Sequence, residues 1–285
     1  MNKTIFKSSS MRSVAIHNLF NRTSIFEPVQ DRILNNNRSY TFKDSLFEVQ
    51  IFGNYLNHST DYPLFAMLIR HWRNAKANNE DPQLLNLPLK EVKDLLLQAN
   101  KGTRAVDFKK IKASLQRLDT NRVSYRLNSK AQNKVFETGY FFEESPVLDF
   151  ESKEIRFSIS EFIEELYMPN SNISYLNIEE LCNIEREANK ALYKYLSTHG
   201  TVMIDFKLEK LSCVLGLKYR GYSEARCREY IVKSLKELQV LGIVRAYKWR
   251  KESNDYRILQ SKYFTAKEAE FAIKHAKSNF KFSRI

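Results

Sequence analysis

The 285-residue sequence carries 46 Lys and Arg against 33 Asp and Glu, which gives a formal net charge of +13. A hydrophobic share of 43% excludes a wholly disordered polycation, because disordered chains lack the apolar residues that build a core. Only 7 glycines occur, so folds that cradle phosphates with glycine-rich loops are disfavoured. The length accommodates one large domain or two modules.

The N-terminal residues are interrupted by basic and serine residues and show no apolar core of signal-peptide length. The longest apolar run, residues 64–69, is far shorter than a membrane span. Cys182, Cys213 and Cys227 form no CxxC pair, and such an odd count is typical of a reducing compartment. We therefore expect a cytoplasmic protein that makes no contact with membranes.

In chain order, the polar residues 1–39 come first and are expected to form a flexible arm. The apolar periodicity that follows predicts a helix, a strand, two helices around a turn, and a strand that opens a hairpin. The expected ranges are 62–72, 84–87, 89–97, 106–119 and 123–127, with the turn at Lys101 and Gly102 and the hairpin tip at Lys130 and Lys134.

The second half of the chain predicts the same order of elements. Gly216 closes one short helix in a C-cap position, and Ser223 is a good N-cap for the next. The expected ranges are a helix at 184–198, a strand at 201–206, helices at 208–215 and 223–241, and a hairpin of 243–247 with 256–259. A further helix is expected in the tail, residues 265–285.

The two halves also share their apolar spacing, since Ile111 and Leu115 fall 120 positions before Ile231 and Leu235. A repeat of this length indicates duplication of a whole domain. The expected fold is α+β, with two tandem winged-helix (helix-turn-helix) domains between a flexible N-terminal arm and a C-terminal helix. The expected boundaries are 1–39 for the arm, 40–170 and 171–264 for the two domains, and 265–285 for the helical tail.

The positive charge is concentrated in two blocks. Residues 90–134 hold 12 basic and 4 acidic residues, residues 207–262 hold 14 and 6, and the segment 135–206 between them holds 5 and 14. Each block taken singly can be an ordinary solvated face. Two such blocks over similar apolar patterns favour a surface for phosphate backbones, which attract cations and release counterions on binding.

In winged helices the second helix of the pair enters the major groove and the hairpin grips the backbone. With Ile231 facing the core, a turn of 3.6 residues points Arg226 and Lys233 outward, and Arg226 is our candidate for bidentate pairing with guanine. With Ile111 inward, Lys109 and Lys112 face out in the first module. The full set of candidate DNA-binding residues is Arg104, Lys109, Lys112, Lys134, Lys218, Arg220, Tyr222, Ser223, Arg226, Arg228, Lys233, Lys248, Arg250 and Lys251.

Signatures of catalysis are missing from the sequence. There is no GxxxxGK[ST] P-loop and no GxGxxG motif, and the five histidines show no HxH or HExxH spacing. Acidic pairs such as Glu143-Glu144, Glu164-Glu165 and Glu179-Glu180 have the chemistry to hold Mg²⁺, but such pairs are more often exposed faces or helix starts. We expect no catalytic residues, no metal, no cofactor and no enzymatic activity.

Residues 178–244 resemble plasmid replication initiators of the IncQ RepC and TrfA type. The resemblance lies in the runs NIEELCNIEREANKALYKYLSTHG, IDFKLEKLSCVLGL and SEARCREYIVKSLKELQVLGIV. It implies a tandem winged-helix protein that binds directly repeated origin sequences (iterons) in double-stranded plasmid DNA, helps to open the origin, and recruits the replicative helicase and other replication proteins. The residues carried over from the resemblance are Arg226, Arg228, Lys233, Lys248 and Arg250.

Three functions compete at this point. A replication initiator is the first, a sequence-specific winged-helix transcriptional repressor is the second, and a nicking enzyme is a distant third. Two modules joined by the acidic segment 135–206 would let a monomer read successive major grooves of an iteron, and a dimer is left open.

Overall fold

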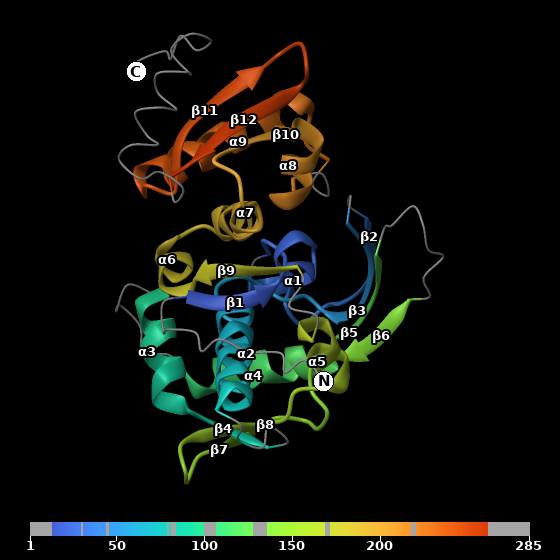
Figure 1. Ribbon diagram of the computed structural model, residues 1–285, viewed down its shortest axis with the longest axis vertical. Helices are drawn as coiled ribbons and strands as arrows, with labels where there is room; N and C mark the ends of the chain where they lie inside the picture. The colour runs from blue at the N-terminus through green and yellow to red at the C-terminus, as the bar shows by residue number, and fades with distance from the viewer. Residues whose placement is uncertain are drawn as a thin grey trace. The chain divides into compact units, whose positions relative to one another are not determined.

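The computed structural model describes residues 13–29, 31–43, 46–78, 80, 84–99, 107–127, 136–168, 172–217 and 221–261. It forms two compact units, Met1–Thr198 with Val214–Leu217 and His199–Cys213 with Lys218–Ile285 (Figure 1). Each unit mixes helices with small antiparallel sheets, as the expected α+β class requires. Within the described residues, no helix is long and apolar enough to cross a membrane.

The first unit is built around α2 (Asp61–Ala77), a helix that is buried along most of its length. A four-stranded sheet lies on one side of it, in the order β2 (Asn37–Lys43), β3 (Phe47–Asn54), β5 (Arg122–Leu127) and β6 (Glu137–Tyr140) (Figure 1). The strand β3 alternates buried and half-buried residues, which is the pattern of a sheet with one face on a core.

Residues 13–29 and 31–39 do not form the flexible arm that their polar composition suggested, and residues 1–12 of the expected arm lie outside the described residues. Within the range 1–39, β1 (Ser13–His17) pairs with β9 (Ile173–Asn177), and α1 (Asn18–Arg22) follows it. Val14 and Phe20 are completely buried. The apolar residues here are few but fall at the positions that face the core, and their strand partner lies some 160 positions away, beyond the reach of any local pattern.

The candidate helix of the first unit, α4 (Phe108–Thr120), is fixed to α2 by a buried ion pair. The Asp61 carboxylate accepts hydrogen bonds from Arg117 Nη2 at 2.7 Å and Nε at 3.2 Å, and from Ser114 Oγ at 2.6 Å. Asn57 N–H adds a fourth donor at 2.9 Å. Because the carboxylate is fully buried, these donors offset its desolvation and fix the orientation of α4.

The acidic segment 135–206 was expected to be a stiff linker, but up to residue 198 it folds into the first unit. Two of its short strands, β7 and β8, form a separate sheet with β4 in the order β4-β8-β7, whereas β6 and β9 join the other sheets of this unit. Along the chain, the first unit therefore ends at Thr198 and the second begins at His199, whereas the expected domain boundary lay between residues 170 and 171. The elements are β4 (Leu85–Pro88), β7 (Val147–Asp149), β8 (Glu154–Phe157), α5 (Glu161–Tyr167), α6 (Ile178–Asn183) and α7 (Glu187–Ser197).

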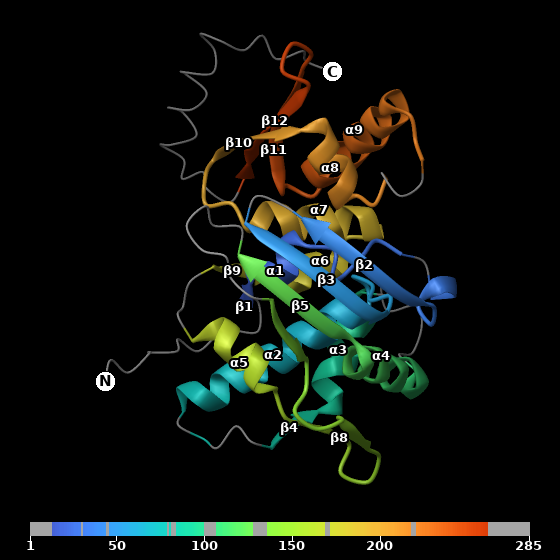
Figure 2. The same ribbon diagram turned by 90° about the vertical axis from the view of Figure 1, so that its right-hand side faces the viewer.

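The second unit has the strand, the two helices and the hairpin that the sequence predicted for it, whereas the helix predicted at 184–198 (α7) belongs to the first unit. Two helices, α8 (Leu208–Val214) and α9 (Glu224–Val240), follow β10 (Met203–Lys207), and β11 (Val244–Arg250) and β12 (Asp255–Gln260) form the hairpin. The strands make one sheet in the order β10-β12-β11, with α9 packed against it (Figure 2). The predicted C-cap glycine that follows α8, Gly216, has a φ of 66°, and Gly242, which follows α9, has a φ of 73°.

The expected duplication is seen in the order of elements but not in the sheets. In the first unit α3 (Leu89–Ala99), α4, β5 and β6 follow β4, as α8, α9, β11 and β12 follow β10 in the second. In the second unit the first strand pairs with the last, whereas β4 pairs with β8 and β5 pairs with β3. The insertion of β7 and β8 after the hairpin supplies β4 with a different partner.

Candidate nucleic-acid interface

The helix α9 has one buried face and one exposed basic face. Ser223 Oγ accepts the N–H of Arg226, which confirms the predicted N-cap. The predicted stripe is buried, since Cys227, Ile231, Leu235 and Leu238 all face the core. Arg226 and Lys233 are exposed on the opposite face, as their helical phase predicted. Their contact with DNA stays a prediction.

Three side chains at the start of α9 form a stacked ladder: the half-buried Tyr222, which precedes the helix, the exposed Arg226 and the half-buried Tyr230. The rings of Tyr222 and Tyr230 stack with centroids 5.3 Å apart and planes 14° apart. The guanidinium carbon of Arg226 lies 4.3 Å from the Tyr222 centroid. Stacking on an aromatic ring limits the conformations that an arginine can adopt and leaves its N–H groups directed to the side. The sequence reasoning missed Tyr230, although the spacing of Tyr222, Arg226 and Tyr230 at four-residue steps carries the signal.

Arg228 faces the hairpin and not the open side of the helix. Its guanidinium carbon lies 5.6 Å from the centroid of the Trp249 ring, and its backbone carbonyl accepts a hydrogen bond from Tyr256 Oη at 3.4 Å. Both contacts join α9 to strands β11 and β12 of its own unit. Arg228 is therefore half-buried and holds the helix on the sheet.

Arg250 is engaged by two acidic residues, one in the hairpin and one on strand β10. It donates to both carboxylate oxygens of Asp255 at 2.6 and 2.7 Å, and it lies 2.8 Å from Asp205, which also accepts two hydrogen bonds from Arg257. These bonds lower the pKa of the Asp255 carboxyl, chiefly through Arg250, and that of Asp205, chiefly through Arg257. The guanidinium of Arg250 is occupied by these partners, so its predicted contact with phosphate would compete with them.

The tip of the β11–β12 hairpin presents other cations. Lys251 is exposed in the turn of residues 251–254, where Asn254 adopts a φ of 51°. Lys207 Nζ donates to the Ser253 carbonyl at 2.7 Å and so fixes the turn to the neighbouring strand. Lys248 is also exposed on β11. The turn thus holds Lys251 at the end of a braced hairpin.

The first unit presents a smaller basic face on α4. Lys109 and Lys112 are exposed, and Ile111 between them is completely buried, as predicted. Asp107 caps the helix by accepting the N–H of Lys109 at 2.9 Å. The remaining candidates lie outside the described residues: Arg104, Lys134, Lys218 and Arg220.

The acidic pairs considered for Mg²⁺ do not come together with further ligands in the part of the chain that the structure describes. No group of three His, Cys, Asp or Glu side chains suited to a metal ion occurs there. Glu164 instead pairs with Lys76 Nζ at 2.5 Å, and Glu180 accepts a hydrogen bond from Tyr193 Oη at 2.7 Å. These carboxylates stabilise the first unit.

Comparison with known proteins gives similarity at the level of the fold. No protein-family model matches the chain, and no curated protein matches it. A crystal structure of domains 2 and 3 of RctB is similar, with a TM-score of 0.51 and 14% identity over 83% of this chain and 95% of that one. A second structure of RctB domains 2–3 gives a TM-score of 0.48 at 14% identity, covering 85% and 96% of the two chains. The Pi initiator protein in complex with iteron DNA gives 0.47 at 12% identity, covering 74% and 97%. The first of these comparisons establishes a fold shared with RctB domains 2 and 3.

Proposed function

We propose that this protein binds double-stranded DNA through its second unit, acting as a winged-helix module. In this proposal α9 enters the major groove and the β11–β12 hairpin contacts the backbone. The observation that carries it is the exposed, stacked Arg226 on a helix whose opposite face is buried in the core. A side chain that serves only as a solvated charge has no need of a fixed conformation, whereas stacking on Tyr222 restricts the conformation of Arg226.

Arg226 is assigned the direct contact with a base. An arginine pairs with O6 and N7 of guanine through two parallel hydrogen bonds, which need a fixed guanidinium plane. Stacking on Tyr222 supplies such a plane before binding, so less side-chain entropy is lost on DNA. Lys233 and Lys251 are assigned phosphate contacts, which position the module without reading sequence.

We further propose that the DNA is a plasmid replication origin with directly repeated sites. The resemblance of residues 178–244 to plasmid replication initiators supports this target. Several bound copies would bend the repeat array, and the stored deformation energy would be released at flexible AT-rich steps. The exposed face of α4 in the first unit would add phosphate contacts. The protein would act by binding and by recruiting the helicase, with no enzymatic activity of its own.

Footprinting of the purified protein on the replicon that encodes it tests the proposal. Protection of direct repeats beside an AT-rich tract is the expected result, with permanganate-reactive thymines appearing in that tract. Protection of a single palindrome over a promoter would instead identify a repressor. Relaxed circles with covalently attached protein, formed from supercoiled origin DNA and Mg²⁺, would identify a nicking enzyme and exclude a purely binding role.

A further inference from the structure

A small pocket in the first unit has the chemistry of an anion site. All twelve residues that line it belong to this unit, and none of them is Asp or Glu. It offers about 20 Å³ to the centres of water-sized molecules, where one water needs roughly 10–15 Å³. The space therefore suits one small ion and is too small for a nucleoside.

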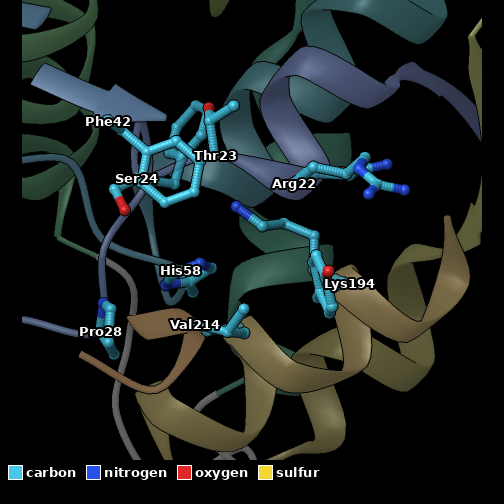
Figure 3. A pocket seen from close by; sticks show the side chains of 12 residues that line it. Arg22, Thr23, Ser24, Pro28, Phe42, His58, Lys194 and Val214 are labelled. Atoms are coloured by element: carbon cyan, nitrogen blue, oxygen red, sulfur yellow. The ribbon is translucent and has the colours of Figure 1, made fainter. Parts of the chain in front are cut away.

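The basic group of the pocket is the ammonium of Lys194, on α7. Figure 3 shows this side chain reaching into the space between Thr23, Phe42 and His58. Lys194 is 2% exposed, and its Nζ makes no hydrogen bond to any described residue. Its contacts are the faces of Phe26, at 5.3 Å from the ring centroid, and Tyr62, at 5.0 Å. Aromatic faces attract a cation but accept no N–H in the manner of an anion.

The nearby carboxylates are already committed to other partners. Glu27 is paired with Arg38, and Glu187 accepts hydrogen bonds from Ser59 Oγ and from the N–H of His58. Lys190, whose Nζ donates to Ser59 Oγ at 2.8 Å, adds a further positive charge beside Glu187. Around the pocket, two half-buried carboxylates thus face the three buried cations Arg38, Lys190 and Lys194, which leaves one positive charge in excess. Of these cations, Lys194 is the one whose charged group has no hydrogen-bond partner among the described residues.

Polar groups complete the lining on the side opposite α7. Ser24 presents its hydroxyl to the pocket, and His58 brings Nε2, a buried nitrogen without a hydrogen-bond partner among the described residues. Arg22 also lines the pocket, but its guanidinium lies over the ring of Tyr195 at 5.5 Å and extends away from Lys194 (Figure 3). Asn21 lines the pocket as well, and its Nδ2 is also buried without a hydrogen-bond partner among the described residues. The donors available to a ligand are therefore Lys194, Asn21, Ser24 and His58.

We propose that this pocket binds one small anion, of the size of chloride, against the ammonium group of Lys194. One or two water molecules would satisfy the hydrogen bonds but leave the buried charge uncompensated, and burial of an unpaired ammonium is costly. Consistent with that cost, burial lowers the pKa of Lys194 to about 7, although Glu187 and Glu27 oppose the shift. The anion would bind the charged form of the lysine and keep the first unit intact independently of DNA.

The direct test measures the titration of Lys194 in the full-length protein. Lysine labelled with ¹³C at Cε is followed by NMR from pH 6 to 10, at constant ionic strength, in gluconate or in chloride. Gluconate is too large for the pocket. Chloride is expected to raise the titration midpoint of Lys194 by about one unit, a tenfold preference for the ammonium form. Equal midpoints in the two salts would overturn the proposal.

Matched lysine variants assign the effect. Lys194→Met removes the charge at similar volume and should abolish both the shifted resonance and any chloride-dependent rise in the midpoint of thermal unfolding. Lys190→Met removes a neighbouring buried lysine that does not line the pocket, so the chloride effect on Lys194 should persist. Loss of the chloride-dependent rise in the thermal midpoint in Lys190→Met, with its retention in Lys194→Met, would place the anion elsewhere. The wild-type titration decides the matter even if Lys194→Met does not fold.

Discussion

The guanidinium of Arg226 lies on the ring of Tyr222, and the ring of Tyr230, one helical turn after Arg226, also stacks on Tyr222. The arrangement predicts that Arg226→Ala weakens binding to the specific site by about 1–3 kcal/mol more than it weakens binding to random DNA, because a bidentate base contact is lost. Competition binding with site and random duplexes at one salt concentration measures the difference.

Lys236→Ala is the matched control for Arg226→Ala. It removes one exposed positive charge from the same helix without touching the ladder. Its effect on specific and random DNA should be equal. If Arg226→Ala behaves in the same way, Arg226 contacts only phosphate and the base assignment is wrong.

Lys251→Ala should weaken binding to every sequence alike. A single phosphate contact is lost, so the slope of log K against log salt should fall by about 0.9. Arg250→Ala serves as the contrast, because Arg250 is bound to Asp255 of the hairpin and to Asp205 of the neighbouring strand β10. That substitution is expected to lower the thermal midpoint of the second unit, whereas Lys251→Ala is not. An unchanged salt slope in Lys251→Ala would remove the hairpin tip from the DNA contacts.

Local signals in the sequence were enough to predict the second unit. Ser223 and Gly216 fixed the ends of its helices, and the apolar stripe through Ile231 fixed the phase of α9. Its exposed candidates followed from that phase. The engagement of Arg250 did not, because the partner Asp205 comes from another strand and becomes a neighbour only once the strand register is known.

The first unit was harder to predict for the same reason. The pairing of β1 with β9 joins Ser13 to Asn177, and a polar composition around Val14 concealed a strand that is buried at all positions except Ser13. Helix periodicity revealed α2 and α4, since each repeats within its own length. A repeat in apolar spacing shows that two segments are similar, but it does not show which strands β4 and β5 pair with. These partners include β8 and β3, which lie outside the repeated segment, so the expected duplication extended only to the order of elements.

The stability of the first unit should fall on acidification because of His17. This side chain caps α1 by accepting the N–H of Leu19 at Nδ1, 3.3 Å away, and burial lowers its pKa from 6.5 to about 4. The folded state therefore holds fewer protons than the unfolded state between these values. Stability is fully present above pH 6.5 and falls by about 1.4 kcal/mol per pH unit as pH drops toward 4.

His17→Asn isolates that proton, since asparagine retains a capping oxygen. Urea unfolding followed at pH 6, 5.5 and 5 should give a shallower dependence on pH for the variant, by about one proton taken up on unfolding. The buried His58, whose pKa burial also lowers to about 4, should keep the remaining dependence in place. If the free energy of unfolding depends on pH with the same slope in the wild type and in His17→Asn, burial does not lower the pKa of His17.

The strand β6 depends on the absence of a side chain at Gly139. A Cβ added there would lie 2.3 Å from Cβ and Cγ of Phe162, on α5, which packs across this strand. Gly139→Ala should therefore destabilise the first unit by about 1–3 kcal/mol through overpacking, whereas Gly200→Ala, which meets no atom within 4 Å, should change stability by less than about 0.5 kcal/mol. Chemical unfolding of both variants measures the difference.

Adding Phe162→Ala removes the atoms that clash with a side chain at position 139. The free energy of unfolding of the double variant should therefore fall by less than the sum of the losses in the two single variants. Strict additivity would mean that the close approach of α5 to β6 is not what excludes a side chain at position 139.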